Sequence, residues 1–328
     1  MSARTARRLV WSLAALTLSL LVLSAVAYLS GSGWHLLAGF FWAFALIFLG
    51  VGGLIAIRHP RNAIGWLFLT VAVASGLGEA THGYAQYWIE GGAGSDTLGK
   101  AAAAYSNVSW IPFVVVPTTF LLLLFPDGRL LSHRWRPIAW CAGLSIAALF
   151  LTAGLAPGPL EDFPQVVNPY GWHSSLQSPL EGLAFLLFLV AVIGSAVSMI
   201  LRFRRSRGEQ RLQLKWLASA AATAAIVVPI GTLGYDVWGE FISNAVIMLS
   251  VLGLPLASGI AILKYRLYDI DLIINRTLVY GALTAILAIA YLGLVVVLQE
   301  ALSFATQESD LAVAGSTLAV AGLFRPLR

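Results

Sequence analysis

Glu79 and His82 are the pair of residues whose types and spacing best suit chemistry. Residues at positions i and i+3 lie on the same face of a helix, so a helix here would present a carboxylate and an imidazole together. Carboxylate-bridged metal sites in helical bundles use this spacing, but they need a second such pair. The sequence has no second Glu-x-x-His pair. We therefore expect no metal site, and we interpret the pair either as part of a ligand pocket or as polar residues that end a helix in water.

Other catalytic patterns are missing from the sequence. It contains no G-x-x-x-x-G-K-[ST], G-x-G-x-x-G, G-x-S-x-G or H-E-x-x-H motif, so there is no signature for phosphate binding, hydrolysis or zinc-dependent catalysis. The single cysteine, Cys141, excludes a disulfide framework and a thiolate metal site. We expect no catalytic residues and no cofactor. An intramembrane enzyme is one alternative for the function, and its chemistry would depend on Glu79 and His82 alone.

The composition predicts a membrane protein. Of the 328 residues 59% are hydrophobic and 11% are charged, whereas a soluble globular protein carries about 25% charged residues. This excludes soluble enzymes, soluble binding modules and disordered chains. A membrane helix needs about 20 apolar residues. The sequence predicts an all-α, polytopic transmembrane bundle in a single domain, 1–328, with nine full-length spans and a shorter tenth, near 9–29, 36–57, 63–82, 105–125, 137–156, 182–201, 216–235, 241–263, 277–299 and 308–324.

The charges predict the orientation of these spans. With the N-terminus in the cytoplasm, 19 of the 20 Lys and Arg residues fall in inner segments and only Lys100 falls outside, as the positive-inside rule requires. We therefore expect a multi-pass cell-membrane protein with both termini cytoplasmic and with anionic lipid at its inner loops, including the arginine cluster at 202–211. The net charge of +5 reflects this orientation, so no nucleic-acid partner is expected. A cleaved signal peptide is the alternative for the first span, which is long for that role.

The outer side is the expected ligand-binding side, because the longest outer loops, near 79–104 and 156–181, lie there. Several prolines in the second loop predict an ordered but irregular cap. The expected pocket has the residues Glu79, His82, Trp88, Trp172 and His173. Four prolines lie inside the expected spans: Pro112, Pro117, Pro229 and Pro255. They are either hinges beneath this pocket or ordinary membrane-helix prolines.

The inner segments carry a resemblance to a known family. They read as strings in a fixed order: Arg58–Trp66; Phe125–Arg129 with Arg134–Pro137; Arg202–Gly208 with Gln213–Trp216; Tyr265–Asp271 with Ile274–Tyr280; and finally Ser309–Ala314 and Leu323–Arg328. Together these strings resemble the multi-span membrane region of a bacterial sensor histidine kinase family, over essentially the whole chain. In that family the last string leads into cytoplasmic signalling and ATP-binding domains. The present sequence has no phosphoacceptor helix pair and no ATP-binding boxes, so kinase activity is not carried over.

The resemblance implies a non-enzymatic membrane sensor or signalling module, whose partner is a second copy in a homodimer or a separate kinase or signalling protein. The alternative is a small-solute transporter or channel. The inner segments serve either as a contact surface for the partner or as determinants of topology. Their residues expected at the inner contact are Arg58, Asp127, Arg129, Arg204, Arg205, Tyr268, Asp269 and Asp271.

Overall fold

The computed structural model describes residues 2–30, 36–91 and 94–263. Its contacts divide the chain after Tyr268 into two units, and all the described residues belong to the first unit. The expected spans near 277–299 and 308–324 lie outside the described residues, as do Tyr268, Asp269 and Asp271. The single membrane domain expected over 1–328 therefore stays a prediction.

The described residues form an all-α bundle, which confirms the predicted fold class. The helices are α1 (Ala3–Ser30), α2 (Leu36–Arg58), α3 (Ala63–Ile89), α4 (Asp96–Ser106), α5 (Ile111–Val115), the π-helical turn η1 (Val116–Leu121), α6 (Leu122–Leu124), the 3₁₀ turn η2 (His133–Trp135), α7 (Arg136–Gly154), α8 (Gln177–Arg205), α9 (Gly208–Leu233) and α10 (Tyr235–Ile262). In this part of the chain, eight helical segments are long and apolar enough to cross a membrane, with Asp96–Leu124 counted as one. The chain is a membrane-embedded protein.

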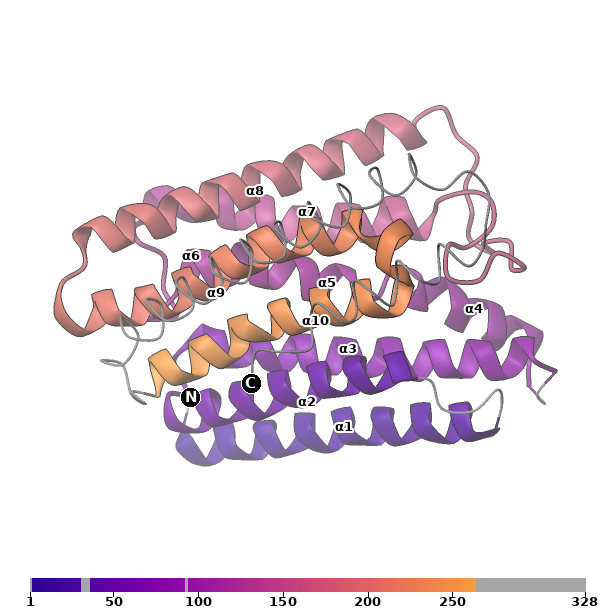
Figure 1. The fold of residues 1–328 in the computed structure, drawn as a ribbon, viewed down its shortest axis with the longest axis horizontal. Coiled ribbons are helices and arrows are strands. Elements are labelled where there is room, and N and C mark those ends of the chain that lie inside the picture. The colour runs from indigo at the N-terminus through magenta and orange to yellow at the C-terminus, as the bar shows by residue number, and fades with distance from the viewer. Residues whose placement is uncertain (1, 31–35, 92–93, 264–328) are drawn as a thin grey trace, which may run out of the picture. The chain divides into compact units, whose positions relative to one another are not determined.

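Helices α1, α2 and α3 lie side by side (Figure 1), and α3 contacts both of the others. Glycines make the contact between α2 and α3 close. A Cβ built on Gly65 would lie 2.7 Å from the backbone nitrogen of Ala56, and one built on Gly52 would lie 2.8 Å from Cβ of Phe68. Small residues let membrane helices approach closely, which increases the van der Waals contact that holds them together.

The second half of the bundle consists of two further pairs, α7 with α8 and α9 with α10 (Figure 1), and α10 also contacts α2. The main core includes Phe44 and Phe48 of α2, Phe68 of α3, Leu121 of η1 and Leu217 of α9, each at most 1% exposed. This core brings together α2, α3, η1, α9 and α10, so it fixes where the ends of these helices lie.

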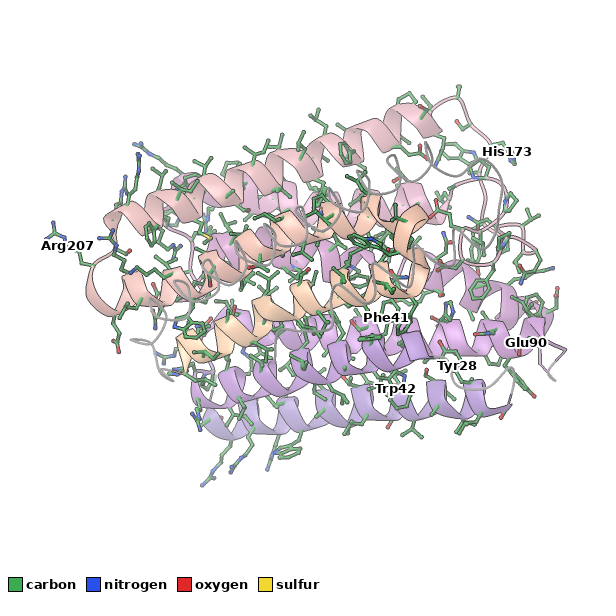
Figure 2. The ribbon with its side chains drawn as sticks, viewed as in Figure 1. Tyr28, Phe41, Trp42, Glu90, His173 and Arg207 are labelled. Carbon is green, nitrogen blue, oxygen red and sulfur yellow. The ribbon has the colours of Figure 1, made fainter. Side chains whose placement is uncertain are left out.

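The two ends of the described bundle differ in charge. Figure 2 shows Arg207 at one end, and Glu90 and His173 at the other. We call the first the basic end, since Arg58, Arg129 and Arg202 line a common cavity there. The other we call the cap end, after the cap loop, residues 155–176. The separation of charge along the helices agrees with the pattern from which the orientation was predicted.

Several helix ends differ from the expected spans. Helix α3 was expected to end near residue 82 but continues to Ile89, and the next helical segment begins at Asp96 rather than near residue 105. The long outer loop expected over 79–104 is therefore wrong. Between the expected spans 182–201 and 216–235, α8 continues to Arg205 and α9 already begins at Gly208. Charged residues mark where a span leaves the hydrocarbon, but the helix does not have to stop there.

The cap loop is irregular and ordered, as its prolines predicted. Asn168 ties it to the end of α7 by donating from Nδ2 to the backbone oxygens of Gly154 (3.0 Å) and Ala156 (2.8 Å). Leu160, Phe163 and Val166 pack against alanines 102–104 of α4 and Ala85 of α3. The cap loop thus covers the cap ends of α3 and α4.

Candidate functional site

A cavity of about 480 Å³ lies at the cap end and contains the predicted pair. We call it the cap cavity. Six described parts of the chain contribute to its wall: α1, α2, α3, the segment from α4 to α5, the cap loop and α10. Its principal side chains are Tyr28, Glu79, His82, Ser106, Trp110 and Asn244. Among its described residues, the wall has two carboxylates, those of Glu79 and Asp162, together with hydroxyl, imidazole, amide and aromatic groups.

Glu79 is buried inside the bundle, with an exposed fraction of 8%. Its Oε2 accepts a long hydrogen bond of 3.4 Å from the hydroxyl of Tyr28 in α1. One of the two interpretations of the pair was that of polar residues that end a helix in water. This interpretation is wrong for Glu79, because α3 continues to Ile89 beyond it and α1 packs over it.

His82 lies one turn beyond Glu79 on the same wall of the cap cavity. Its Nδ1 is 3.0 Å from Oγ of Ser106 at the end of α4. The imidazole ring also lies near the ring of Phe163 in the cap loop, with 4.9 Å between the centroids. His82 therefore connects α3 to both α4 and the cap loop.

Glycines of α3 let the neighbouring helices reach this site. A Cβ on Gly78 would lie 2.7 Å from Oγ of Ser109, and a Cβ on Gly83 would lie 3.2 Å from the backbone oxygen of Ser24. Gly78 directly precedes Glu79, and Gly83 directly follows His82. The sequence around the pair thus permits the close approach of α1 and of the segment after α4, which bring Tyr28 and Ser106 to it.

The structure does not bring the other three predicted pocket residues to the cap cavity. Trp88 lies on a smaller cavity of about 370 Å³, together with Lys100 and part of the cap loop. Trp172 and His173 are exposed on the cap loop. Trp88 instead covers Gly99 of α4, where an added Cβ would overlap the indole.

The four span prolines occupy different helical settings. Pro112 is in the first turn of α5, where a proline fits without breaking a hydrogen bond. Pro117 is the second residue of the π-helical turn η1, and Thr118 donates from its hydroxyl to the carbonyl of Val114 (2.6 Å). Pro229 and Pro255 lie inside α9 and α10. Their role as hinges stays a prediction.

Three of the expected inner-contact residues lie together at the basic end. Arg58, Asp127 and Arg129 line a cavity of about 950 Å³, which we call the basic cavity. Arg205 lies on a separate cavity of about 490 Å³, and Arg204 is exposed. Two ends of the bundle thus carry cavities of opposite character, one around a carboxylate and the other around arginines.

Sequence reasoning missed three residues of these sites. Tyr28 and Ser106 supply the hydrogen bonds to Glu79 and His82, and Arg202 is buried beside the basic cavity. The sequence placed Arg202 in a cluster for anionic headgroups without indicating that it is buried; the contact of this cluster with lipid stays a prediction. A tyrosine hydroxyl near the end of an otherwise apolar span was a local signal for Tyr28, but nothing in the sequence paired it with Glu79.

Among the residues that the structure describes, no group of three or more His, Cys, Asp or Glu side chains is placed to hold a metal ion. In the comparisons with known proteins, no family model, no curated protein and no solved structure matches this chain.

Proposed function

We propose that this chain is an integral membrane sensor that binds a small amine-bearing solute in the cap cavity and signals through the basic end. The observation that supports this is the burial of Glu79 on the cavity wall, with one long hydrogen bond from Tyr28. Removing a carboxylate from water is costly unless a partner compensates for its lost hydration. A cationic solute would supply that compensation.

The remaining wall of the cap cavity suits a small organic cation. Trp110, Phe41 and Phe113 provide aromatic faces, which attract ammonium groups through the negative potential of the ring. Ser75 adds a buried hydroxyl that has no hydrogen-bond partner in the part of the chain that the structure describes. The volume of about 480 Å³ lies in the usual range for small-molecule sites.

One continuous segment leads from the cap cavity to the basic end. It begins with Phe113 on the cavity wall, passes through η1 and α6, and reaches the turn at Phe125–Arg129. There Arg202 of α8 donates to the backbone oxygen of Arg129 (2.8 Å). π-Helical turns often occur at functional sites. We therefore propose that η1 is the part of this segment whose conformation changes when the ligand binds.

The cellular setting in this proposal follows from charge and from the resemblance. The chain lies in a bacterial plasma membrane, with its basic end and both termini on the cytoplasmic side, as the distribution of Lys and Arg predicts. Its partner there is a second copy or a separate kinase, since a sensor histidine kinase resemblance implies a cytoplasmic signalling protein.

Ligand binding is tested by thermal unfolding of the purified protein in a neutral detergent. The probes are ethanolamine and tetramethylammonium, with ethylene glycol as the neutral control. We expect the amines to raise the apparent melting temperature of the wild type, because a ligand that binds only the folded state stabilises it. Glu79→Gln should abolish this effect. Glu161→Gln, which changes an exposed carboxylate of the cap loop, should retain it; equal loss in both variants would contradict the proposal.

Signalling is tested with a fluorophore at the basic end. In a Cys141→Ser background, the variant Ser132→Cys offers one exposed thiol for an environment-sensitive dye. We expect the probe that binds in the thermal test to change the emission, and Glu79→Gln to prevent that change. The alternative, a transporter or channel, predicts instead that the same amine accumulates in proteoliposomes. Accumulation that Glu79→Gln abolishes, without a change in emission, would favour transport.

A further inference from the structure

The basic cavity is a second site, at the opposite end of the described helices from the cap cavity. Its volume is about 950 Å³. Six described parts of the chain form its wall: the start of α1, the end of α2 with the turn into α3, the turn after α6, the end of α8, the start of α9 and the end of α10. The turns are held together by Asn62, whose Nδ2 donates to the backbone oxygen of Pro126 at 2.9 Å.

Positive charge predominates in this cavity. Arg58, Arg61, Arg129 and Arg202 line it, and Asp127 is the only carboxylate among its described lining residues. Asp127 reaches Arg202 over a long distance of 3.8 Å. Within the described part of the chain, the other three arginines have no salt bridge. Among the described residues, four cations thus share one anion around an open volume, and the resulting positive potential attracts a further anion.

Arg202 shows that the cavity is built rather than a chance gathering of surface charge. Its side chain is 6% exposed. One terminal nitrogen, Nη2, donates to the backbone oxygens of Leu123 (3.2 Å) and Arg129 (2.8 Å), but the buried Nε has no hydrogen-bond partner among the described residues. A buried guanidinium with an unused donor is costly to maintain unless an anion compensates for its lost hydration.

The N-terminal end of α3 adds to the positive electrostatic potential in the basic cavity. Asn62 caps the helix by accepting at Oδ1 from the backbone nitrogen of Ile64 (3.0 Å), and residues 59–62 line the cavity. The first turn of a long helix carries a partial positive charge that stabilises an anion. This contribution has the same sign as that of the arginines.

We propose that the basic cavity binds a phosphate group, carried either by a lipid headgroup or by a free phosphorylated compound. Arginine matches phosphate because its planar guanidinium donates two parallel hydrogen bonds to two oxygens. The exposed arginines 58, 61 and 129 hold the phosphate, and Arg202 provides the buried positive charge behind them. The volume leaves room for the group to which the phosphate is attached.

The test is thermal unfolding of the full chain in a neutral detergent. The probes are inorganic phosphate, glycerol 3-phosphate and dihexanoyl phosphatidylglycerol, each compared with sodium chloride at equal ionic strength. We expect a saturable rise in the apparent melting temperature with at least one phosphate probe and none with chloride. Saturation by phosphatidylglycerol alone assigns the site to a lipid headgroup, and saturation by glycerol 3-phosphate assigns it to a free compound. No saturable effect from any phosphate probe would overturn the proposal.

Matched variants separate the cavity from the general charge of the basic end. Arg58→Gln with Arg61→Gln should weaken binding about tenfold or more, since each removes a charged hydrogen-bond donor. Arg204→Gln with Arg207→Gln removes the same charge from exposed positions outside the cavity and should leave binding unchanged. Asp127→Asn should tighten binding, because it removes the competing carboxylate. Equal weakening in the two double variants would overturn the proposal.

Discussion

At the scale of single residues, the two ends of the bundle each depend on a buried ionisable group. Glu79 has its hydroxyl partner in α1, and Arg202 has its carbonyl partners in the turn after α6 and at the end of that helix. In both cases, the partners are far away in the sequence. Each group therefore joins separate segments of the chain, and its removal should be felt as a loss of stability as well as of binding.

We expect Tyr28→Phe to lower the apparent melting temperature of the purified protein. The substitution keeps the ring and removes the hydroxyl that donates to Glu79. A buried acceptor left without a partner costs about 1–3 kcal/mol of the free energy of unfolding. Tyr170→Phe, at an exposed position of the cap loop, is the control and should not change it. If both variants have the same apparent melting temperature as the wild type, the hydrogen bond to Glu79 contributes nothing measurable to stability.

Arg202→Met should destabilise the protein more than Arg204→Met. The first change leaves the backbone oxygens of Leu123 and Arg129 without their donor, at about 1–3 kcal/mol for each acceptor. The second removes an exposed arginine of the same helix. Thermal unfolding in detergent measures both. Arg202→Lys should recover part of the lost stability, because it keeps the positive charge. The recovery should be incomplete, because lysine lacks the planar guanidinium that can donate several hydrogen bonds.

At the scale of helices, close packing depends on glycine at particular positions. Along α3, Gly65 approaches the backbone of α2, whereas Gly76 and Gly83 approach α1. Ala72, Gly76 and Ala80 are spaced four residues apart along α3, and a Cβ added at Gly76 would lie 3.4 Å from Cβ of Leu20 in α1. Gly143 and Ala147 in α7 have the same spacing, but within the described part of the chain nothing lies within 4 Å of a Cβ added at Gly143.

Gly65→Ala should therefore lower stability, whereas Gly50→Ala should not. The methyl group at position 65 would lie 2.7 Å from a backbone nitrogen of α2, which cannot move without the helix, whereas nothing lies within 4 Å at position 50. Overpacking typically costs about 1–3 kcal/mol. An alanine at an open helical position is neutral or stabilising by about 1 kcal/mol or less. Thermal unfolding compares the two, and a larger loss at position 50 would contradict the packing.

At the scale of the whole molecule, charge is separated between the two ends of the described bundle. The basic end carries the arginines of α1, α2 and α8, whereas the cap end carries Glu90, Glu161 and Glu181. This asymmetry determines the orientation with which a chain is inserted into a membrane, since cationic loops stay in the cytoplasm. It also gives the two cavities different chemistry, because each takes its charged residues from the end where it lies.

We expect the cap loop to be accessible from outside the cell and the basic end to be accessible only from within. In a Cys141→Ser background, Ser175→Cys should react with a membrane-impermeant maleimide in intact cells. Ser132→Cys should react only after permeabilisation. Neither position is buried, so accessibility within the protein does not decide the result. The reverse pattern would show that the predicted orientation is inverted.

The sequence by itself determined the fold class, the helix centres and the separation of charge. These properties are local: the length of an apolar run predicts a membrane helix, and the charge of each arginine does not depend on how the helices pack. It also identified Glu79 and His82 as a pair, because three positions on one helix fix a shared face. The residues Asp127 and Gly128 between Phe125 and Arg129 are typical of a turn, and Gly128 has a positive φ of 70°.

Only the tertiary structure decided what surrounds these residues. Glu79 meets Tyr28 across 51 positions of sequence, and Arg202 meets Leu123 across 79. Such pairs arise from how the helices pack, and the apolar pattern of a membrane helix specifies that poorly, because lipid and a neighbouring helix are equally apolar. For the same reason, the sequence placed Trp88, Trp172 and His173 in the pocket with Glu79, whereas the packing of α4 and the cap loop places them elsewhere.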